Sequence, residues 1–106
     1  MNRLLPLAGL LCITAPLQFA LGEGQTHRIE MKNVAFVPAE IRLHVGDTVQ
    51  WDNSDIAAHT ATSSEGGFDV NVVPGRKGSV VVKRSGNFAY ICRFHPNMKG
   101  QLTVDP

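Results

Sequence analysis

The chain has 106 residues, of which ten are Lys or Arg, nine are Asp or Glu, and 43% are hydrophobic. This length allows one domain at most. The near balance of charge excludes the strongly basic surface by which proteins bind nucleic-acid backbones, so no nucleic-acid partner is expected.

The first element in chain order is an apolar run. Arg3 carries a positive charge, residues 4–20 carry none and are rich in leucine, and small residues lie at Ala20 and Gly22. A basic, then apolar, then small-residue order is typical of a secretory signal peptide. We expect cleavage after Gly22, which divides the chain into a signal peptide over residues 1–22 and a domain over residues 23–106.

A membrane anchor and a lipid anchor are the alternatives for this segment. The apolar run is barely long enough to span a bilayer, and Pro6 and Pro16 interrupt it. A lipoprotein signal would carry a small residue before Cys12, where this chain has Leu11. A cleaved signal fits better than either, so we expect no stable membrane insertion and a mature protein that is periplasmic or otherwise exported.

The rest of the sequence alternates apolar and polar residues with a period of two, as short β-strands do. The turn signal Gly46-Asp47 separates two such runs and predicts a hairpin over residues 41–51. Short strands divided by turn signals indicate an all-β domain, a two-sheet antiparallel sandwich. The predicted strands are residues 28–31, 41–45, 48–51, 79–83, 88–92 and 101–104, and the predicted core residues are Trp51, Phe68, Val70, Val80, Val82 and Phe88.

Residues 92–98 carry three potential metal ligands of differing softness. They read Cys92-Arg-Phe-His95-Pro-Asn-Met98 and offer a thiolate, an imidazole and a thioether between two predicted strands. A fourth donor must come from another connection, and His59 is the suitable residue. Two imidazoles, one thiolate and a weak thioether make up the donor set of blue-copper electron-transfer sites. We therefore expect one copper ion, cycling between Cu(I) and Cu(II), at these four residues.

Each candidate ligand also has an ordinary structural role. Cys92 could be a buried apolar residue or form a disulfide between two chains, and Met98 could fill the core, as Met31 is expected to do. His27, near the new N-terminus, and His44, on the polar face of a strand, are interpreted as surface residues. It is improbable that all four residues occupy suitable positions by coincidence, because they include the only cysteine of the mature chain. Zinc also accepts thiolate and imidazole ligands, but it rarely takes a thioether.

The ligand motif resembles that of the cupredoxins, the family of plastocyanin, pseudoazurin and amicyanin. The Cys-x-x-His-x-x-Met spacing, with Pro96 after the histidine, is similar to the short ligand loop of amicyanin. Residues 36–38, 45–49 and 51–53 look like early strands of the family, and the resemblance extends from about Ile29 to Val104. It implies an eight-stranded Greek-key sandwich with copper at one end.

The resemblance also assigns roles to the site residues. It implies that His59, Cys92 and His95 form a trigonal plane and that Met98 is the long axial ligand. It further implies that redox partners dock on an apolar patch around His95, through which the electron leaves. The patch would be lined by Phe94, Pro96 and Pro74.

The chain departs from the family at two positions near the site. Better-known members carry Asn after the first histidine, where it tethers the two ligand loops, whereas this chain has Thr60. We expect the Thr60 hydroxyl to order the loop instead, with an effect on the reduction potential. The second departure is Arg93-Phe94, where amicyanin carries a small polar residue and proline. The positive charge of Arg93 beside the docking face would favour acidic partners, but one residue does not decide this.

These residues favour a monomeric one-electron carrier between redox proteins. By resemblance, a dehydrogenase and a c-type cytochrome are the expected kinds of partner. The alternative is a copper-binding module that delivers or stores the ion, but only Met31 and Met98 remain after the signal, and copper carriers tend to be richer in methionine or histidine. A metal-free structural sandwich is a third possibility. We expect no enzyme and no catalytic residue, because four protein ligands leave no open coordination position.

Overall fold

The computed structural model describes residues 24–106, and the predicted signal peptide over residues 1–22 lies outside the described residues. The described part is built of strands, and it contains no helix that could cross a membrane. The strands are β1 (Thr26–Met31), β2 (Phe36–Val37), β3 (Glu40–His44), β4 (Thr48–Asn53), β5 (His59–Ser63), β6 (Phe68–Val72), β7 (Lys77–Val81), β8 (Gly86–Ile91) and β9 (Lys99–Asp105).

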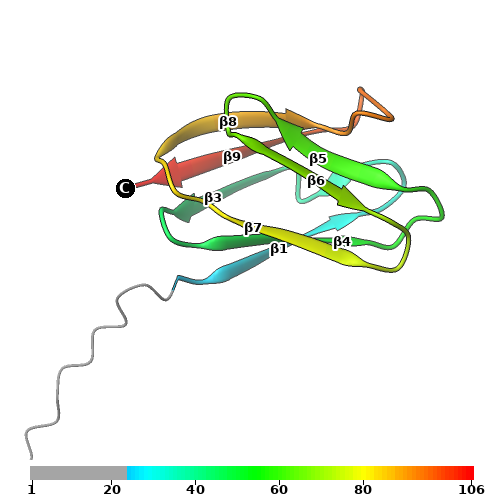
Figure 1. Ribbon diagram of the computed structural model, residues 1–106, viewed down its shortest axis with the longest axis horizontal. Coiled ribbons are helices and arrows are strands. Elements are labelled where there is room, and N and C mark those ends of the chain that lie inside the picture. The colour runs from blue at the N-terminus through cyan, green and yellow to red at the C-terminus, as the bar shows by residue number, and fades with distance from the viewer. Residues whose placement is uncertain (1–23) are drawn as a thin grey trace, which may run out of the picture.

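The strands form two sheets that face each other (Figure 1), with the orders β2-β1-β4-β7 and β3-β9-β8-β5-β6. The predicted two-sheet all-β sandwich is therefore confirmed. The expectation of purely antiparallel sheets is wrong, because β1 pairs with β4 and β3 pairs with β9 in parallel. The described residues form nine strands rather than eight, and β2 is only two residues long.

The predicted hairpin over residues 41–51 is wrong, although both of its strands exist. β3 and β4 belong to different sheets. Val45 donates its N–H to Asp105 of β9, whereas the N–H of Gly46 bonds to Val82, just after β7. The chain therefore crosses from one sheet to the other at Gly46, whose φ of 98° suits a residue without Cβ. Alternation identified the inward face of each strand, but it carries no information about the neighbouring strand.

Alternating side chains of both sheets form the core between them. Trp51 and Tyr90 are fully buried, and Val82 is buried as predicted, while Phe68, Val70, Val80 and Phe88 pack against the core with partial exposure. Phe36 lies edge-on to Tyr90 with ring centroids 4.6 Å apart, and Trp51 lies 5.6 Å from the same ring. Burial of these large rings supplies much of the hydrophobic stabilisation and makes the framework rigid.

Candidate metal centre

The candidate ligands meet because β5 runs antiparallel to β8. Thr62 pairs with Ile91, so the beginning of β5 lies beside the end of β8. His59 is the first residue of β5 rather than part of the preceding loop, and Cys92 directly follows β8. His95 lies in the connection from β8 to β9, which is drawn in orange at one end of the sandwich (Figure 1).

Three of the four predicted ligands come together. The donor atoms of His59, Cys92 and His95 all lie within 4.8 Å of one another. Cys92 Sγ is 3.7 Å from Nδ1 of His59 and 3.7 Å from Nδ1 of His95, and the two imidazole rings are 5.1 Å apart at 66°. A thiolate and two ring nitrogens that face one space are the trigonal donor set that suits copper.

Asp55 determines which nitrogen of His59 is free for a metal. Its carboxylate lies 2.8 Å from His59 Nε2 and also accepts the N–H groups of Asn33 at 2.7 Å and Val34 at 2.9 Å. A carboxylate accepts hydrogen bonds, so it holds a proton on Nε2 of His59 and leaves Nδ1, which faces Cys92, as the nitrogen available to a metal. Sequence reasoning missed this contact, since no local pattern links Asp55 to His59.

The ligand loop, residues 92–98, is closed by its own backbone. The N–H of Cys92 donates to the Met98 carbonyl at 3.0 Å, the N–H of Met98 to the His95 carbonyl at 2.8 Å, and the N–H of His95 to the Cys92 carbonyl at 3.3 Å. Met98 is buried at the end of this loop, with 1% of its surface exposed. The short spacing of the motif thus gives a tight loop that holds two of the donors and fixes the backbone of Met98.

The environment of Cys92 favours its thiolate. Burial opposes ionisation, but the N–H of Thr60, the imidazoles of His95 and His59 and the N–H of Phe94 outweigh it and lower the pKa of Cys92 to about 6. Metal ligation requires this deprotonated form. The thiol has no exposed surface, so in this conformation it cannot reach the thiol of a second chain.

Thr60 makes the expected tether between the two ligand segments. Its Oγ1 accepts the N–H of Arg93 at 2.9 Å, and its own N–H donates to Cys92 Sγ at 3.4 Å. Thr60 follows one histidine ligand and Arg93 follows the cysteine. One threonine side chain and one backbone amide therefore connect the start of β5 with the ligand loop.

Comparison with known proteins is consistent with this geometry. Residues 4–104 match the family model of the cupredoxin-like domain. The chain belongs to this family. Amicyanin-alpha of Methylorubrum extorquens is 28% identical over 83 residues, which cover 73% of this chain and 70% of that protein. The predicted membership in the cupredoxins, close to amicyanin, is confirmed, and copper is the cofactor that both the family and the donor set indicate.

Solved cupredoxins share the fold. A Cu(I) form of an amicyanin variant superposes with a TM-score of 0.69 at 21% identity, covering 76% of this chain and 82% of that one. The purple cupredoxin from Nitrosopumilus maritimus gives a TM-score of 0.67 at 26% identity, covering 74% of this chain and 99% of that one. The fold of the described residues is therefore that of solved cupredoxins.

The two other histidines of the described residues lie away from the centre of this cupredoxin. His27 is partly buried and contacts Asp47 at 2.9 Å, and His44 is exposed at the end of β3. Met31 is fully buried in the core, as expected. Asp52 lies within β4 and pairs with Arg28.

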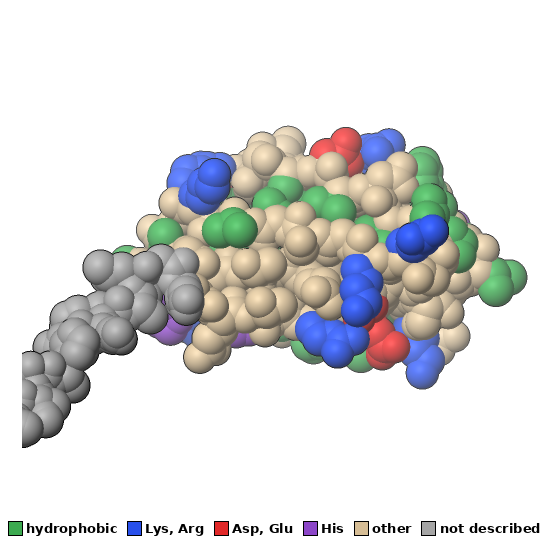
Figure 2. Space-filling model, turned by 60° about the horizontal axis from the view of Figure 1, so that its bottom comes forward, with side chains coloured by type: hydrophobic (Ala, Val, Ile, Leu, Met, Phe, Trp, Pro, Cys, Tyr) green, Lys and Arg blue, Asp and Glu red, His purple; other side chains and the backbone are tan. Residues whose placement is uncertain are grey.

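Apolar side chains are exposed around the candidate centre. Register places the β1–β2, β4–β5 and β6–β7 connections at the same end as the ligand loop, since Met31 pairs with Asn53 and His59 with Val72. Figure 2 shows apolar side chains gathered at the end of the molecule away from the grey segment. Exposed members on these connections are Val34, Ile56, Val73 and Phe94, and Pro74 and Pro96 are exposed between them. We call this set the apolar surface.

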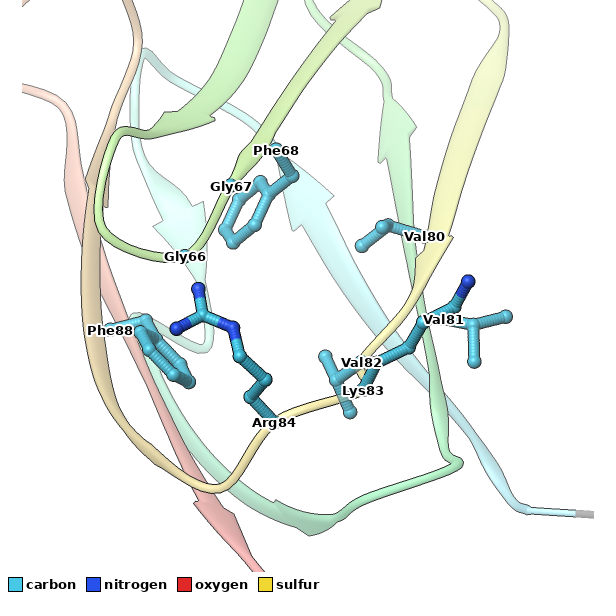
Figure 3. Close-up of a pocket in the computed structure, with 9 residues that line it drawn as sticks. All are labelled: Gly66, Gly67, Phe68, Val80, Val81, Val82, Lys83, Arg84 and Phe88. Carbon is cyan, nitrogen blue, oxygen red and sulfur yellow. The ribbon is translucent and has the colours of Figure 1, made fainter.

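A groove of about 320 Å³ opens at the other end, between β6, β7 and the β7–β8 connection (Figure 3). Figure 3 shows the Arg84 guanidinium directed between the rings of Phe68 and Phe88. Arg84 also donates to the Glu65 carbonyl and lies 5.2 Å from the Phe88 ring. None of the lining residues is His, Cys, Met, Asp or Glu, so the groove offers no donor set for a metal.

Proposed function

We propose that this cupredoxin is an exported type 1 copper protein that carries single electrons between redox proteins. The observation that carries the proposal is the convergence of His59, Cys92 and His95 around one space, with all donor atoms within 4.8 Å of one another. Met98, buried at the end of the ligand loop, is the residue that would supply a fourth donor, a thioether. When bound at these residues, copper supplies a centre that takes up and releases one electron.

The protein supplies a rigid and dry enclosure for that centre. His59 and Cys92 have no exposed surface, and Asp55 and Thr60 hold their donor atoms in place. Ligands fixed by packing and by hydrogen bonds change position little when the charge of the site changes, and this favours rapid electron exchange. We propose no enzymatic role, because four protein ligands would leave no open coordination position for a substrate.

Electron exchange with partners is proposed to occur at the apolar surface. His95 is partly exposed, whereas His59 and Cys92 are not, so the imidazole of His95 is the proposed exit. Phe94 beside it is 48% exposed, and Ile56 is 98% exposed. Apolar surface of this kind marks sites of protein association. The charge of Arg93 is paired with Asp69 at 3.1 Å, so it gives this surface little preference for acidic partners.

The cellular setting completes the proposal. Residues 1–22 are proposed to be the signal peptide, residues 23–106 the cupredoxin domain, and the periplasm or another exported compartment its location. The proposed partners are a dehydrogenase and a c-type cytochrome, and the carrier is proposed to act as a monomer. A buried single cysteine is consistent with an oxidising compartment, because burial protects the thiol.

The decisive experiment is the visible spectrum of the purified domain after addition of Cu(II). We expect an intense charge-transfer band from the thiolate, loss of that band in Cys92→Ser, and reversible one-electron voltammetry. A colourless protein that binds Zn(II) more tightly than Cu(II) would contradict the proposal. A coloured protein that exchanges no electrons with an electrode, but passes its copper readily to a chelator, would favour the delivery or storage role instead.

A further inference from the structure

Four residues beside the ligand loop form a closed ring of hydrogen bonds. Arg93 donates its backbone N–H to Thr60 Oγ1 at 2.9 Å and its side-chain Nε–H to Asp69 Oδ1 at 3.1 Å. Between these, Thr60 Oγ1 lies 2.9 Å from Thr62 Oγ1, and the Thr62 hydroxyl donates to Asp69 Oδ1 at 2.7 Å. The ring leaves the ligand loop at the backbone of Arg93 and returns to it at the side chain of the same residue.

The direction of the hydrogen bonds in the ring follows from Asp69. A carboxylate can only accept, and the hydroxyl of Thr62 and the guanidinium of Arg93 lower the pKa of Asp69, so it is ionised at neutral pH. The single hydroxyl proton of Thr62 is used on Asp69, so Thr62 Oγ1 accepts the proton of the Thr60 hydroxyl. The lone pairs of Thr60 Oγ1 are then free for the N–H of Arg93. Each hydroxyl accepts and donates in sequence, and bonds in such a chain strengthen one another.

We propose that Asp69 positions the ligand loop from the protein surface, through this ring. Asp69 lies on β6, an edge strand, and its side chain is 56% exposed, while that of Arg93 is 44% exposed. An isolated ion pair with this exposure contributes little to stability. However, Asp69 is the last acceptor in a chain of two threonine hydroxyls. It thereby orients Thr60 Oγ1, which accepts the backbone N–H of Arg93.

The ring therefore acts next to the proposed copper ligands without touching them. Thr60 follows His59, and its N–H donates to Cys92 Sγ at 3.4 Å, so a shift of Thr60 alters a hydrogen bond to the sulfur. Hydrogen bonds that orient metal ligands tune the metal. The part of this inference that concerns copper rests on the proposed function, whereas the ring can be tested in the metal-free protein.

The test compares amide hydrogen exchange of Arg93 by NMR in the metal-free domain and in single variants. We expect Asp69→Ala, which removes the acceptor, and Thr62→Val each to accelerate exchange about tenfold, the factor for loss of roughly one ordinary hydrogen bond. Thr62→Ser keeps the hydroxyl and should restore slow exchange. Asp105→Ala is the matched control, because it breaks another exposed pair, Arg42–Asp105 at 2.8 Å, on β3 and β9 at the far end. Urea unfolding of each variant confirms that it folds.

The double variant Asp69→Ala/Thr62→Val distinguishes a ring from separate contacts. Residues that act as one unit give non-additive effects, so the double variant should exchange no faster than either single variant. The same variants loaded with copper should shift the reduction potential in the same direction, with Asp105→Ala unchanged. Additive acceleration, or normal exchange in Asp69→Ala together with fast exchange in Thr62→Val, would overturn the role of Asp69. Failure of the wild-type domain to bind copper would overturn the proposed function and leave the exchange result standing.

Discussion

Asp55→Asn is the substitution that tests most directly how the fold prepares the metal centre. In the native protein Asp55 Oδ1 accepts the Asn33 N–H, and Oδ2 accepts both the Val34 N–H and the His59 Nε2–H. An amide has one acceptor oxygen, so at least one of these donors then faces an NH₂ group. Asp55 is only 15% exposed, and an unsatisfied donor at such a site costs about 1–3 kcal/mol.

The backbone around Asn33 and Val34 increases the effect. Both residues have a φ of 56°, the left-handed region, which is unfavourable for a β-branched residue such as Val34. The Asp55 carboxylate stabilises this turn through both N–H groups. We therefore expect Asp55→Asn to lower the free energy of unfolding of the metal-free protein by about 2 kcal/mol. We also expect it to lower copper affinity about 10- to 100-fold, because His59 loses the partner that fixes its tautomer.

Urea unfolding followed by Trp51 fluorescence measures the first quantity, and competition with a chelator of known affinity measures the second. Asp52→Asn is the control, since Asp52 contacts Arg28 and Gln50 but not His59. It should change stability without a matching loss of copper affinity. Unchanged affinity in Asp55→Asn, whatever happens to stability, would show that the carboxylate braces the turn and has no part in orienting the ligand.

Three further predictions concern ionisation and packing. The thiol of Cys92 in the metal-free protein should ionise with a midpoint near pH 6, which ultraviolet titration of the thiolate measures, and a midpoint near the ordinary value of 9.0 would contradict the structure. Hydrogen bonds from the backbone and from a histidine lower the pKa of Asp47 to about 2. Its contribution to stability is therefore complete above the ordinary pKa of 3.8 and is lost as pH falls towards 2. Urea unfolding between these pH values should show a smaller loss of unfolding free energy in Asp47→Asn than in the native protein. Gly100→Ala should destabilise the fold by about 1–3 kcal/mol in the same assay, because the new Cβ would lie 2.3 Å from the ring of the fully buried Tyr90.

The candidate ligand set could be proposed from the sequence because most of it is local. Cys92, His95 and Met98 lie on one short loop, and the choice of His59 followed from the small number of histidines. The structure brings the donor atoms of His59, Cys92 and His95 to one place. The position of Thr60 also suggested its role, because a residue next to a ligand is a natural place for a tether.

The contacts that hold the ligands could not be predicted, because they join residues far apart in the chain. Asp55 contacts a turn more than twenty residues earlier, and Asp69 reaches a loop more than twenty residues later. Strand β5 was missed for a different reason: its sequence, His-Thr-Ala-Thr-Ser, holds a single apolar residue, Ala61. β5 is buried because it lies between β6 and β8. The pattern of apolar and polar residues in its own sequence does not reveal which strands lie beside it.

The place of β9 in the sheet determines when the metal centre can exist. This strand lies between β3 and β8, and every other described strand precedes it in the chain. A pairing across so many residues forms late, since the intervening chain must first be ordered. Before β9 pairs, β8 lacks one neighbour and the loop of residues 92–98 lacks its anchor. The proposed copper site can therefore take up its ion only late in folding, after this strand has found its place in the sheet.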